Sequence, residues 1–245
     1  MDNLEQPSKT LLSLEGIRGV YEYVLGWVFH VPLQFICSKG DDHPVMIIPG
    51  LGGADGSTHY IRNFLTEINY ETHPWGLGRN FGPREGLEPL LDRLSKRVVD
   101  ISEQSGGREV SLIGWSLGGV YAREIAKVVP NSVRQVITLG TPFKGDAAGT
   151  NATFLYEILS KDKSHRDPNV LKRIAEPPPV PFTSLYSKSD GVVHWQCSIE
   201  PDGELSESIE IPGASHLGLG HNPISMYVIA NRLQQEKDTW KPYKK

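Results

Sequence analysis

The chain has 245 residues, 38% hydrophobic and 22% charged, so it is long enough to bury the core of one globular domain. Its formal net charge is −4 and no basic stripe runs along it, which argues against a nucleic acid partner. Two cysteines are too few for a disulfide framework. We therefore expect Cys37 and Cys197 to be two buried thiols, with pairing as the alternative. The histidine and cysteine spacing predicts no metal site.

The N-terminal part predicts a helical segment at about residues 14–36, amphipathic over Gly16–Phe29. Glu22 and His30 interrupt its most apolar stretch, Val20–Ile36, and make it a poor transmembrane span. We expect the helix to pack on the domain edge or on a second subunit; lying on a membrane surface is less favoured because its polar face has few Lys and Arg. No secretory signal is visible, which predicts a location in the cytoplasm or peripheral to a membrane.

Short apolar runs and helical patterns alternate along the rest of the chain. Strands are predicted at Val45–Pro49, Tyr70–Trp75, Val110–Ile113, Val133–Leu139, Phe182–Tyr186 and Ser208–Ile211. Helices are predicted at Tyr60–Ile68, Leu87–Ser105, Val120–Ala126 and Asn222–Glu236. This alternation predicts the α/β fold class, with a single domain over residues 1–245 and a mostly parallel central sheet that has helices on both faces.

The connection at about residues 144–181 is too long for a plain loop between a strand and a helix. It contains a predicted helix at Thr153–Ser160 and ends in Pro177-Pro178-Pro179. One interpretation is a cap or lid over the site, with the prolines as a stiff return. The other is a crossover helix that packs on the sheet, and the pattern favours neither.

The pentapeptide Gly114-Trp115-Ser116-Leu117-Gly118 has the form G-x-S-x-G and lies between a predicted strand and a predicted helix. In that context it predicts a nucleophile elbow, a sharp turn that holds the serine in strained backbone geometry. Small flanking residues avoid clashes with this turn. We expect the Ser116 hydroxyl to stand at the carboxyl end of the sheet, where a base can reach it.

A serine hydroxyl is a weak nucleophile that needs a base and a group that orients the base. In this architecture the acid and then the histidine follow the serine along the chain, each after a strand. Asp190 follows the fifth predicted strand and His216 follows the last. The predicted catalytic triad is therefore Ser116, Asp190 and His216.

Other residues of the same types are weaker candidates. Asp146 and Asp162 come too early, within the predicted cap, and Asp202 lies in the turn before the last strand. His221 is the serious rival of His216, because the neighbouring glycines make its loop mobile. However, His221 looks like the start of the last helix, whereas His216 lies nearer the strand end.

The tetrahedral intermediate of acyl transfer needs N–H donors that are already in place. One predicted donor is the Leu117 amide, next to the nucleophile at the N-terminus of a helix whose dipole favours negative charge. The other is expected in Gly50-Leu51-Gly52-Gly53, after the first strand. Leu51 is the first choice for this oxyanion hole and Gly52 is its rival. An ordinary tight turn is the alternative, although few turns need three glycines in four positions.

From about Pro44 to the last helix, these segments resemble the α/β-hydrolase superfamily, within its lipase- and esterase-like branch. The resemblance rests on Pro49-Gly50-Leu51-Gly52-Gly53, Gly114-Trp115-Ser116-Leu117-Gly118-Gly119, Thr138-Leu139-Gly140-Thr141-Pro142, Ser189-Asp190-Gly191-Val192-Val193 and His216. It implies an acyl-enzyme mechanism without a cofactor. One departure is Pro49, where many members carry histidine; proline there also occurs in lipase- and acyltransferase-like members.

The expected function is hydrolysis of a small-molecule carboxylic ester. Several apolar side chains favour a lipophilic acyl group: Trp75, Leu77, Phe81, Phe143, Phe154 and Trp195. An acyltransferase or a thioesterase with the same triad stays open, as does a non-catalytic binding protein of the same fold. Besides the ester, the expected partners are a second copy of the chain, as a homodimer, or a lipid or membrane surface.

Overall fold

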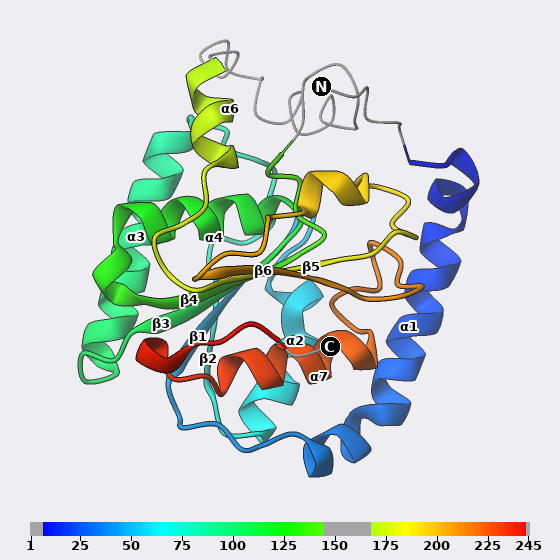
Figure 1. The fold of residues 1–245 in the computed structure, drawn as a ribbon, viewed down its shortest axis with the longest axis horizontal. Coiled ribbons are helices and arrows are strands. Elements are labelled where there is room, and N and C mark those ends of the chain that lie inside the picture. Colours follow the sequence, from blue (N-terminus) through cyan, green and yellow to red (C-terminus); the bar gives the residue numbers. More distant parts are fainter. Residues whose placement is uncertain (1–6, 145–167, 244–245) are drawn as a thin grey trace.

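Six parallel strands form the centre of the part of the chain that the computed structural model describes, residues 7–144 and 168–243 (Figure 1). They are β1 (Pro44–Ile48), β2 (Glu71–Pro74), β3 (Val110–Trp115), β4 (Val133–Leu139), β5 (Phe182–Tyr186) and β6 (Ser206–Glu210). Their order is β2-β1-β3-β4-β5-β6, and every neighbouring pair is parallel. The predicted α/β class and parallel sheet are confirmed.

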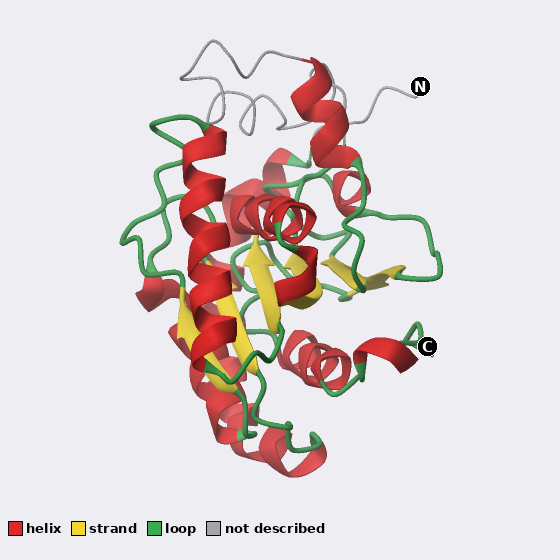
Figure 2. Cartoon of the chain, turned by 90° about the vertical axis from the view of Figure 1, so that its left-hand side faces the viewer, coloured by secondary structure: helices red, strands yellow, loops and turns green. Residues whose placement is uncertain are grey.

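Helices cover both faces of this sheet (Figure 2). They are α1 (Lys9–Ile36), α2 (His59–Glu67), α3 (Leu87–Gln104), α4 (Leu117–Val128), α6 (Pro168–Ala175) and α7 (Pro223–Leu233). In Figure 1, α3, α4 and α6 lie on one side of the strands, and α2 and α7 lie on the other. The predicted helices correspond to α1, α2, α3, α4 and α7. The sequence pattern did not predict α6.

Strand β1 shows how one segment serves two cores. Val45 and Ile47 pack in the cluster that includes Phe64 of α2, while Met46 and Ile48 pack in the cluster that includes residues of α3 and α4. Side chains alternate across a strand, so a strand covered on both faces must be apolar at every position. This explains the uninterrupted apolar run in the sequence.

The common direction of the strands determines where their loops meet. The loops after β1, β3, β5 and β6 leave the sheet at its carboxyl edge, because all neighbouring pairs are parallel. These loops carry Leu51, Ser116, Asp190 and His216 respectively. The fold thus gathers residues that are far apart in sequence.

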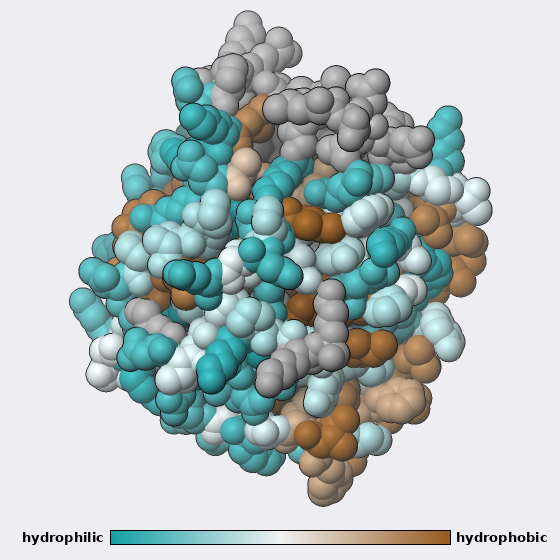
Figure 3. All heavy atoms as spheres, in the orientation of Figure 1, coloured by the Kyte–Doolittle hydropathy of each residue, from teal (hydrophilic) through white to brown (hydrophobic). Residues whose placement is uncertain are grey.

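Helix α1 buries polar residues and exposes apolar ones. Glu15 and Glu22 are buried on the side that packs against α7 and α2. Ile17, Val20 and Phe35 are exposed, and Figure 3 shows hydrophobic side chains along the side of the molecule where α1 lies. This is the reverse of the usual pattern for a surface helix. The predicted packing at the domain edge is observed, and contact with a second subunit or a membrane stays a prediction.

In the described ranges, no helix is long and apolar enough to cross a membrane. The predicted cap helix at Thr153–Ser160 lies outside the described residues, so the cap or lid at residues 144–181 stays a prediction. The same holds for the weaker candidates Asp146 and Asp162. Cys37 and Cys197 are both buried thiols, as expected.

Candidate active site

Ser116 lies in the turn between β3 and α4, with φ 52° and ψ −122°. Positive φ is rare outside glycine, and such strain costs about 1–3 kcal/mol. Hydrogen bonds hold the turn: the Ser116 N–H donates to the Leu139 carbonyl at 2.8 Å, and its carbonyl accepts from Gly119 N–H at 2.9 Å and Thr141 Oγ1 at 3.0 Å. The strained strand–turn–helix geometry is as the pentapeptide predicts.

Two glycines allow close approaches around this turn. A Cβ at Gly118 would lie 2.4 Å from the Ile48 carbonyl oxygen, so only glycine lets the helix start against β1. Gly140 has φ 54°, and a Cβ there would lie 3.0 Å from both Asp190 Oδ2 and His216 Nδ1. Gly140 therefore leaves room for the acid–base pair beside the backbone of the loop after β4.

Asp190 and His216 are buried and hydrogen-bonded to each other, with 2.7 Å between Asp190 Oδ2 and His216 Nδ1. The other carboxylate oxygen accepts hydrogen bonds from the N–H groups of Val192 at 2.8 Å and Val193 at 2.7 Å. With Nδ1 donating to Asp190, Nε2 of the neutral ring is an acceptor. The pair has the geometry of a base and the acid that orients it.

The local charges favour the protonated form of His216. Burial opposes that form, but the charge and hydrogen bond of Asp190 and the charge of Glu15 outweigh burial, so the pKa of His216 is raised above its ordinary value. A higher pKa makes the neutral ring a stronger proton acceptor, provided the pH lies above it.

Ser116 and His216 line one cavity of about 350 Å³ at the carboxyl edge of the sheet. Its lining consists of Gly50, Leu51, Gly52, Gly53, Ser57, Trp115, Ser116, Val192, His216 and Leu217. No hydrogen bond joins Ser116 Oγ to His216 in this structure, although both residues are among those described. Catalytic hydrogen bonds of this kind often tighten only when substrate binds.

The rival residues lie in different surroundings. The His221 ring packs against Tyr23, Tyr60 and Trp115, with centroid distances of 5.0, 5.5 and 5.6 Å, and burial lowers its pKa. It lies next to Asn222, the N-cap of α7, close to the helix start that the sequence predicts. Asp202 is exposed in the loop before β6. The structure thus brings Asp190 to His216 and leaves both rivals elsewhere.

The loop after β1 separates the two oxyanion-hole candidates. The Gly52 N–H donates to the Asn80 carbonyl at 2.7 Å, so it is not available to a ligand in this arrangement. Leu51 lines the cavity. Leu117 is the first residue of α4, and the first N–H groups of a helix have no acceptor within it. The roles of the Leu51 and Leu117 amides as oxyanion donors stay a prediction.

Asn80 is a site residue that the sequence analysis missed. It is buried, and its side-chain amide donates to the Pro49 carbonyl at 2.9 Å while its backbone N–H donates to the Gly53 carbonyl at 2.7 Å. Together with the bond from Gly52, these contacts fix the loop that presents Leu51. The available signal was a polar residue at the end of a glycine-rich stretch after β2.

Five of the apolar side chains from which we inferred a lipophilic acyl group lie away from the Ser116 cavity. Trp75, Leu77 and Phe81 line a separate cavity of about 330 Å³. Phe143 is buried in the core, and Trp195 stacks on Tyr186 with ring centroids 5.9 Å apart. These residues do not line the Ser116 cavity, because that cavity is formed by other loops. Its apolar lining comes from Leu51, Trp115, Val192 and Leu217, and Phe154 lies outside the described residues.

Solved structures share this architecture. A monoacylglycerol lipase from Paleococcus ferrophilus has a TM-score of 0.59 at 15% identity, covering 80% of this chain and 96% of its own. An α/β superfamily hydrolase from Oenococcus oeni has a TM-score of 0.55 at 17% identity, covering 80% of this chain and 94% of its own. At these identities the likeness shows the fold. The chain has the fold of an α/β-hydrolase.

Curated relatives match about half of the chain, and the chain spans less than half of their length. A triacylglycerol lipase from Pseudarthrobacter phenanthrenivorans is 30% identical over 129 residues, which is 49% of this chain and 38% of the relative. One from Burkholderia plantarii has the same identity over 129 residues, 34% of its length. The human serine hydrolase BPHL is 28% identical over 118 residues, 45% of this chain and 40% of its own. No family model matches the chain.

Proposed function

We propose that this protein is a serine carboxylic ester hydrolase with Ser116 as nucleophile, His216 as base and Asp190 as the acid that orients it. The observation that carries the proposal is the buried Asp190–His216 pair beside a strained serine on one cavity. Relatives named triacylglycerol lipase and serine hydrolase support an ester as the substrate class.

The proposed mechanism uses these residues in turn. Ser116 Oγ attacks the acyl carbonyl carbon while His216 Nε2 takes the hydroxyl proton. As the tetrahedral intermediate collapses, His216 gives that proton to the leaving alcohol, and an acyl ester remains on Ser116. Water then attacks this ester with His216 as base again, which releases the carboxylic acid and restores the serine.

The oxyanion of each tetrahedral intermediate needs donors at the point where the charge develops. In this proposal, the Leu51 and Leu117 amides supply them from the two sides of Ser116. Leu117 lies at the N-terminus of α4, where the positive end of the helix dipole also favours the oxyanion. The bonds from Asn80 hold the Leu51 loop in place, so the donors need no rearrangement during the reaction.

The proposed substrate carries a lipophilic acyl group. Leu51, Trp115, Val192 and Leu217 give the cavity wall its apolar character. The cavity volume of about 350 Å³ lies at the lower end of the range for small-molecule sites, about 300–1,000 Å³. A series of p-nitrophenyl esters of increasing chain length measures the preferred acyl group directly.

The test of the proposed function compares wild-type protein with Ser116→Ala in ester hydrolysis. We expect the substitution to lower kcat by about 10⁶-fold while the thermal unfolding curve remains cooperative. Equal rates for the two proteins would contradict the proposal. If Ser116 reacts with a fluorophosphonate probe while no ester of any length is hydrolysed, an acyltransferase, a thioesterase or a special substrate is favoured instead.

The contact predicted for α1, with a second copy of the chain or with a lipid surface, remains a proposal. It is supported by the exposed apolar side chains on the outward side of α1 and by the shortage of Lys and Arg there. Packing against a second copy is favoured. Light scattering of the protein alone, followed by flotation with neutral lipid vesicles, separates the two partners.

A further inference from the structure

The buried side of α1 lies against the two loops that carry Asp190 and His216. A Cβ on Gly191 would lie 2.5 Å from the carbonyl carbon of Leu11, and a Cβ on Gly19 would lie 2.9 Å from Leu217 Cβ. Both loops therefore approach the backbone of this helix closely. The contact is unusual in composition, because α1 offers charged side chains to it.

Glu15 joins the two loops through one carboxylate. Its Oε1 accepts hydrogen bonds from the Gly191 N–H at 2.7 Å and the His216 N–H at 3.1 Å, and its Oε2 accepts from the Leu217 N–H at 3.1 Å. The side chain is buried, and a buried carboxylate is stable only when such donors satisfy it. One donor follows Asp190 directly, and another belongs to His216 itself.

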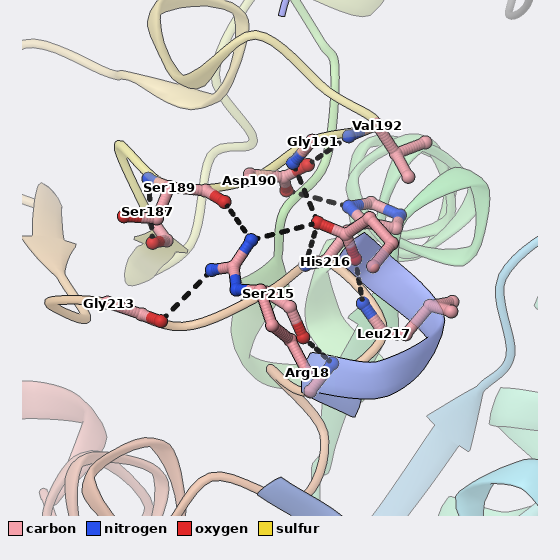
Figure 4. Close-up of polar contacts among 12 residues, drawn as sticks. Arg18, Ser187, Ser189, Asp190, Gly191, Val192, Gly213, Ser215, His216 and Leu217 are labelled. Atoms are coloured by element: carbon pink, nitrogen blue, oxygen red, sulfur yellow. Dashed lines mark hydrogen bonds and ion pairs between the residues drawn. The ribbon is translucent and has the colours of Figure 1, made fainter. Parts of the chain in front are cut away.

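Arg18, one turn further along α1, repeats this connection with the opposite charge. Its guanidinium donates to the Ser189 carbonyl at 2.8 Å and to the Gly213 carbonyl at 3.1 Å, and one nitrogen lies 3.6 Å from Glu15 Oε1. Figure 4 shows Arg18 between the segment that carries Asp190 and the segment that carries His216. Two neighbouring side chains thus link the same pair of loops.

We propose that Glu15 is a positioning residue of the catalytic site, and that its carboxylate holds the Asp190 loop and the His216 loop at the separation that the acid–base pair requires. The kinetic part of this proposal rests on the proposed ester hydrolysis. Nothing in the mechanism requires Glu15 to touch substrate; it acts through the backbone of His216 and of the residue after Asp190.

Glu15 also acts on His216 through its charge. Two charged groups act on the imidazole: Asp190, which is hydrogen-bonded to it, and Glu15 from α1. Arg18 lies beside Glu15, and Glu22 lies two turns further along the helix. The Glu15 charge contributes to the raised pKa of His216. Removing that charge should therefore lower the pKa of His216 and move the acid limb of the pH–rate profile to lower pH.

The experiment compares wild type with Glu15→Gln. We expect kcat for p-nitrophenyl ester hydrolysis to fall about 10- to 100-fold with little change in KM, because the acid–base pair loses its alignment. NMR titration of the His216 ring should show a lower pKa in the variant. An unchanged kcat together with an unchanged His216 titration would overturn the proposal.

Glu22→Gln is the matched control. Glu22 lies on the same side of the same helix and is equally buried, but it accepts from Ser215 N–H at 2.8 Å and from the Asn222 side chain. Burial raises its own pKa. We expect this variant to leave the His216 titration where it is; an equal shift in both variants would assign the effect to general loosening of α1 and overturn the specific role of Glu15.

Arg18→Gln gives a second test if Glu15→Gln does not fold. It removes the positive charge beside Glu15, so the acid limb and the His216 titration should move to higher pH, opposite to the effect of Glu15→Gln. A shift to lower pH, or none, would overturn the proposal. Because the NMR titration needs no turnover, a protein that hydrolyses no ester but shows the expected shift in each variant that folds would contradict the proposed function and support the role of Glu15.

Discussion

Groups composed of serine, histidine and aspartate lie at both ends of strand β3, and they differ in almost everything except composition. At the carboxyl end, Ser116 lines a cavity with His216, which is paired with Asp190. At the amino end, Ser111 Oγ lies 2.8 Å from His43 Nε2, and Nδ1 of the same ring is paired with Asp41. The second group has the more complete hydrogen-bond chain.

The serines differ in backbone and access. Ser116 has positive φ and stands beside helix α4, whereas Ser111 is a fully buried residue within β3. At the carboxyl edge, Leu117 begins helix α4, and a cavity with apolar side chains in its wall lies beside Ser116. Ser111 lies beside neither a helix start nor this cavity, and the pairing of β3 with β4 is irregular next to it. Its hydrogen bond to His43 satisfies two polar groups in the core.

The histidines also differ in charge environment. Burial lowers the pKa of His43; Asp41 opposes this, while Arg134 and Arg108 add to it. For His216 the neighbours are Asp190 and Glu15, and its pKa is raised. A base that must hold a proton in the transition state needs the second environment. Serine, histidine and aspartate are therefore a catalytic candidate only where the serine is strained, a cavity reaches it and the charges near the histidine raise its pKa.

The largest loss of activity is expected from a change at Asp190, the acid of the carboxyl-edge group. Asp190→Asn should lower kcat by about 10⁴-fold, because the amide favours the wrong tautomer of His216. Asp41→Asn, at the other end of β3, and Asp202→Asn, in the exposed loop, should hydrolyse p-nitrophenyl esters close to the wild-type rate. A large loss in Asp202→Asn with none in Asp190→Asn would reverse our assignment.

Asn80 holds the loop of a proposed oxyanion donor, so a change at Asn80 should affect only the carboxyl-edge site. Asn80→Ala should lower kcat about 10- to 100-fold, less than the loss expected from removing an oxyanion donor outright, about 10²–10³-fold. Ser111→Ala is the matched change at the amino edge. It should lower the free energy of unfolding by about 1–3 kcal/mol and leave kcat unchanged. Equal kcat losses in the two variants would remove the distinction.

The smallest effect concerns the dependence of stability on pH. The pKa of His43 is lower in the folded protein than its ordinary 6.5, so unfolded chains bind the proton better and its contribution to stability is lost as pH falls below that value. The pKa of His216 is higher than 6.5, so its contribution is present below that value and is lost as pH rises through the folded pKa. In urea unfolding across pH, the free energy of unfolding should fall less at acid pH in His43→Gln than in wild type. In His216→Gln it should fall less at alkaline pH. Unchanged slopes would contradict both signs.

Local patterns predicted the fold because the buried strands are short segments rich in apolar residues that alternate with helical patterns. The predicted bounds Val133–Leu139 and Phe182–Tyr186 are those of β4 and β5. The same logic placed Ser116 in its strained turn and put Asp190 and His216 after two strands of one parallel sheet. Chain order and strand direction suffice for this.

The parts that sequence did not predict depend on contacts between distant segments. Glu15 bonds to His216 across 201 positions, and no local pattern reports such a partner. Asn80 owes its role to contacts with the loop after β1 in the same way. A different limit applies to the apolar side chains from which we inferred a lipophilic acyl group. An apolar side chain such as Phe143 has the same sequence pattern in a core and in a cavity wall.

The most direct test of Ser116 as the nucleophile is to label the wild-type protein with a fluorophosphonate and to map the adduct by peptide mass spectrometry. We expect one modified peptide with the phosphonate on Ser116, no adduct on Ser111, and loss of labelling in Ser116→Ala. Labelling of Ser111, or equal labelling of wild type and Ser116→Ala, would contradict this role of Ser116.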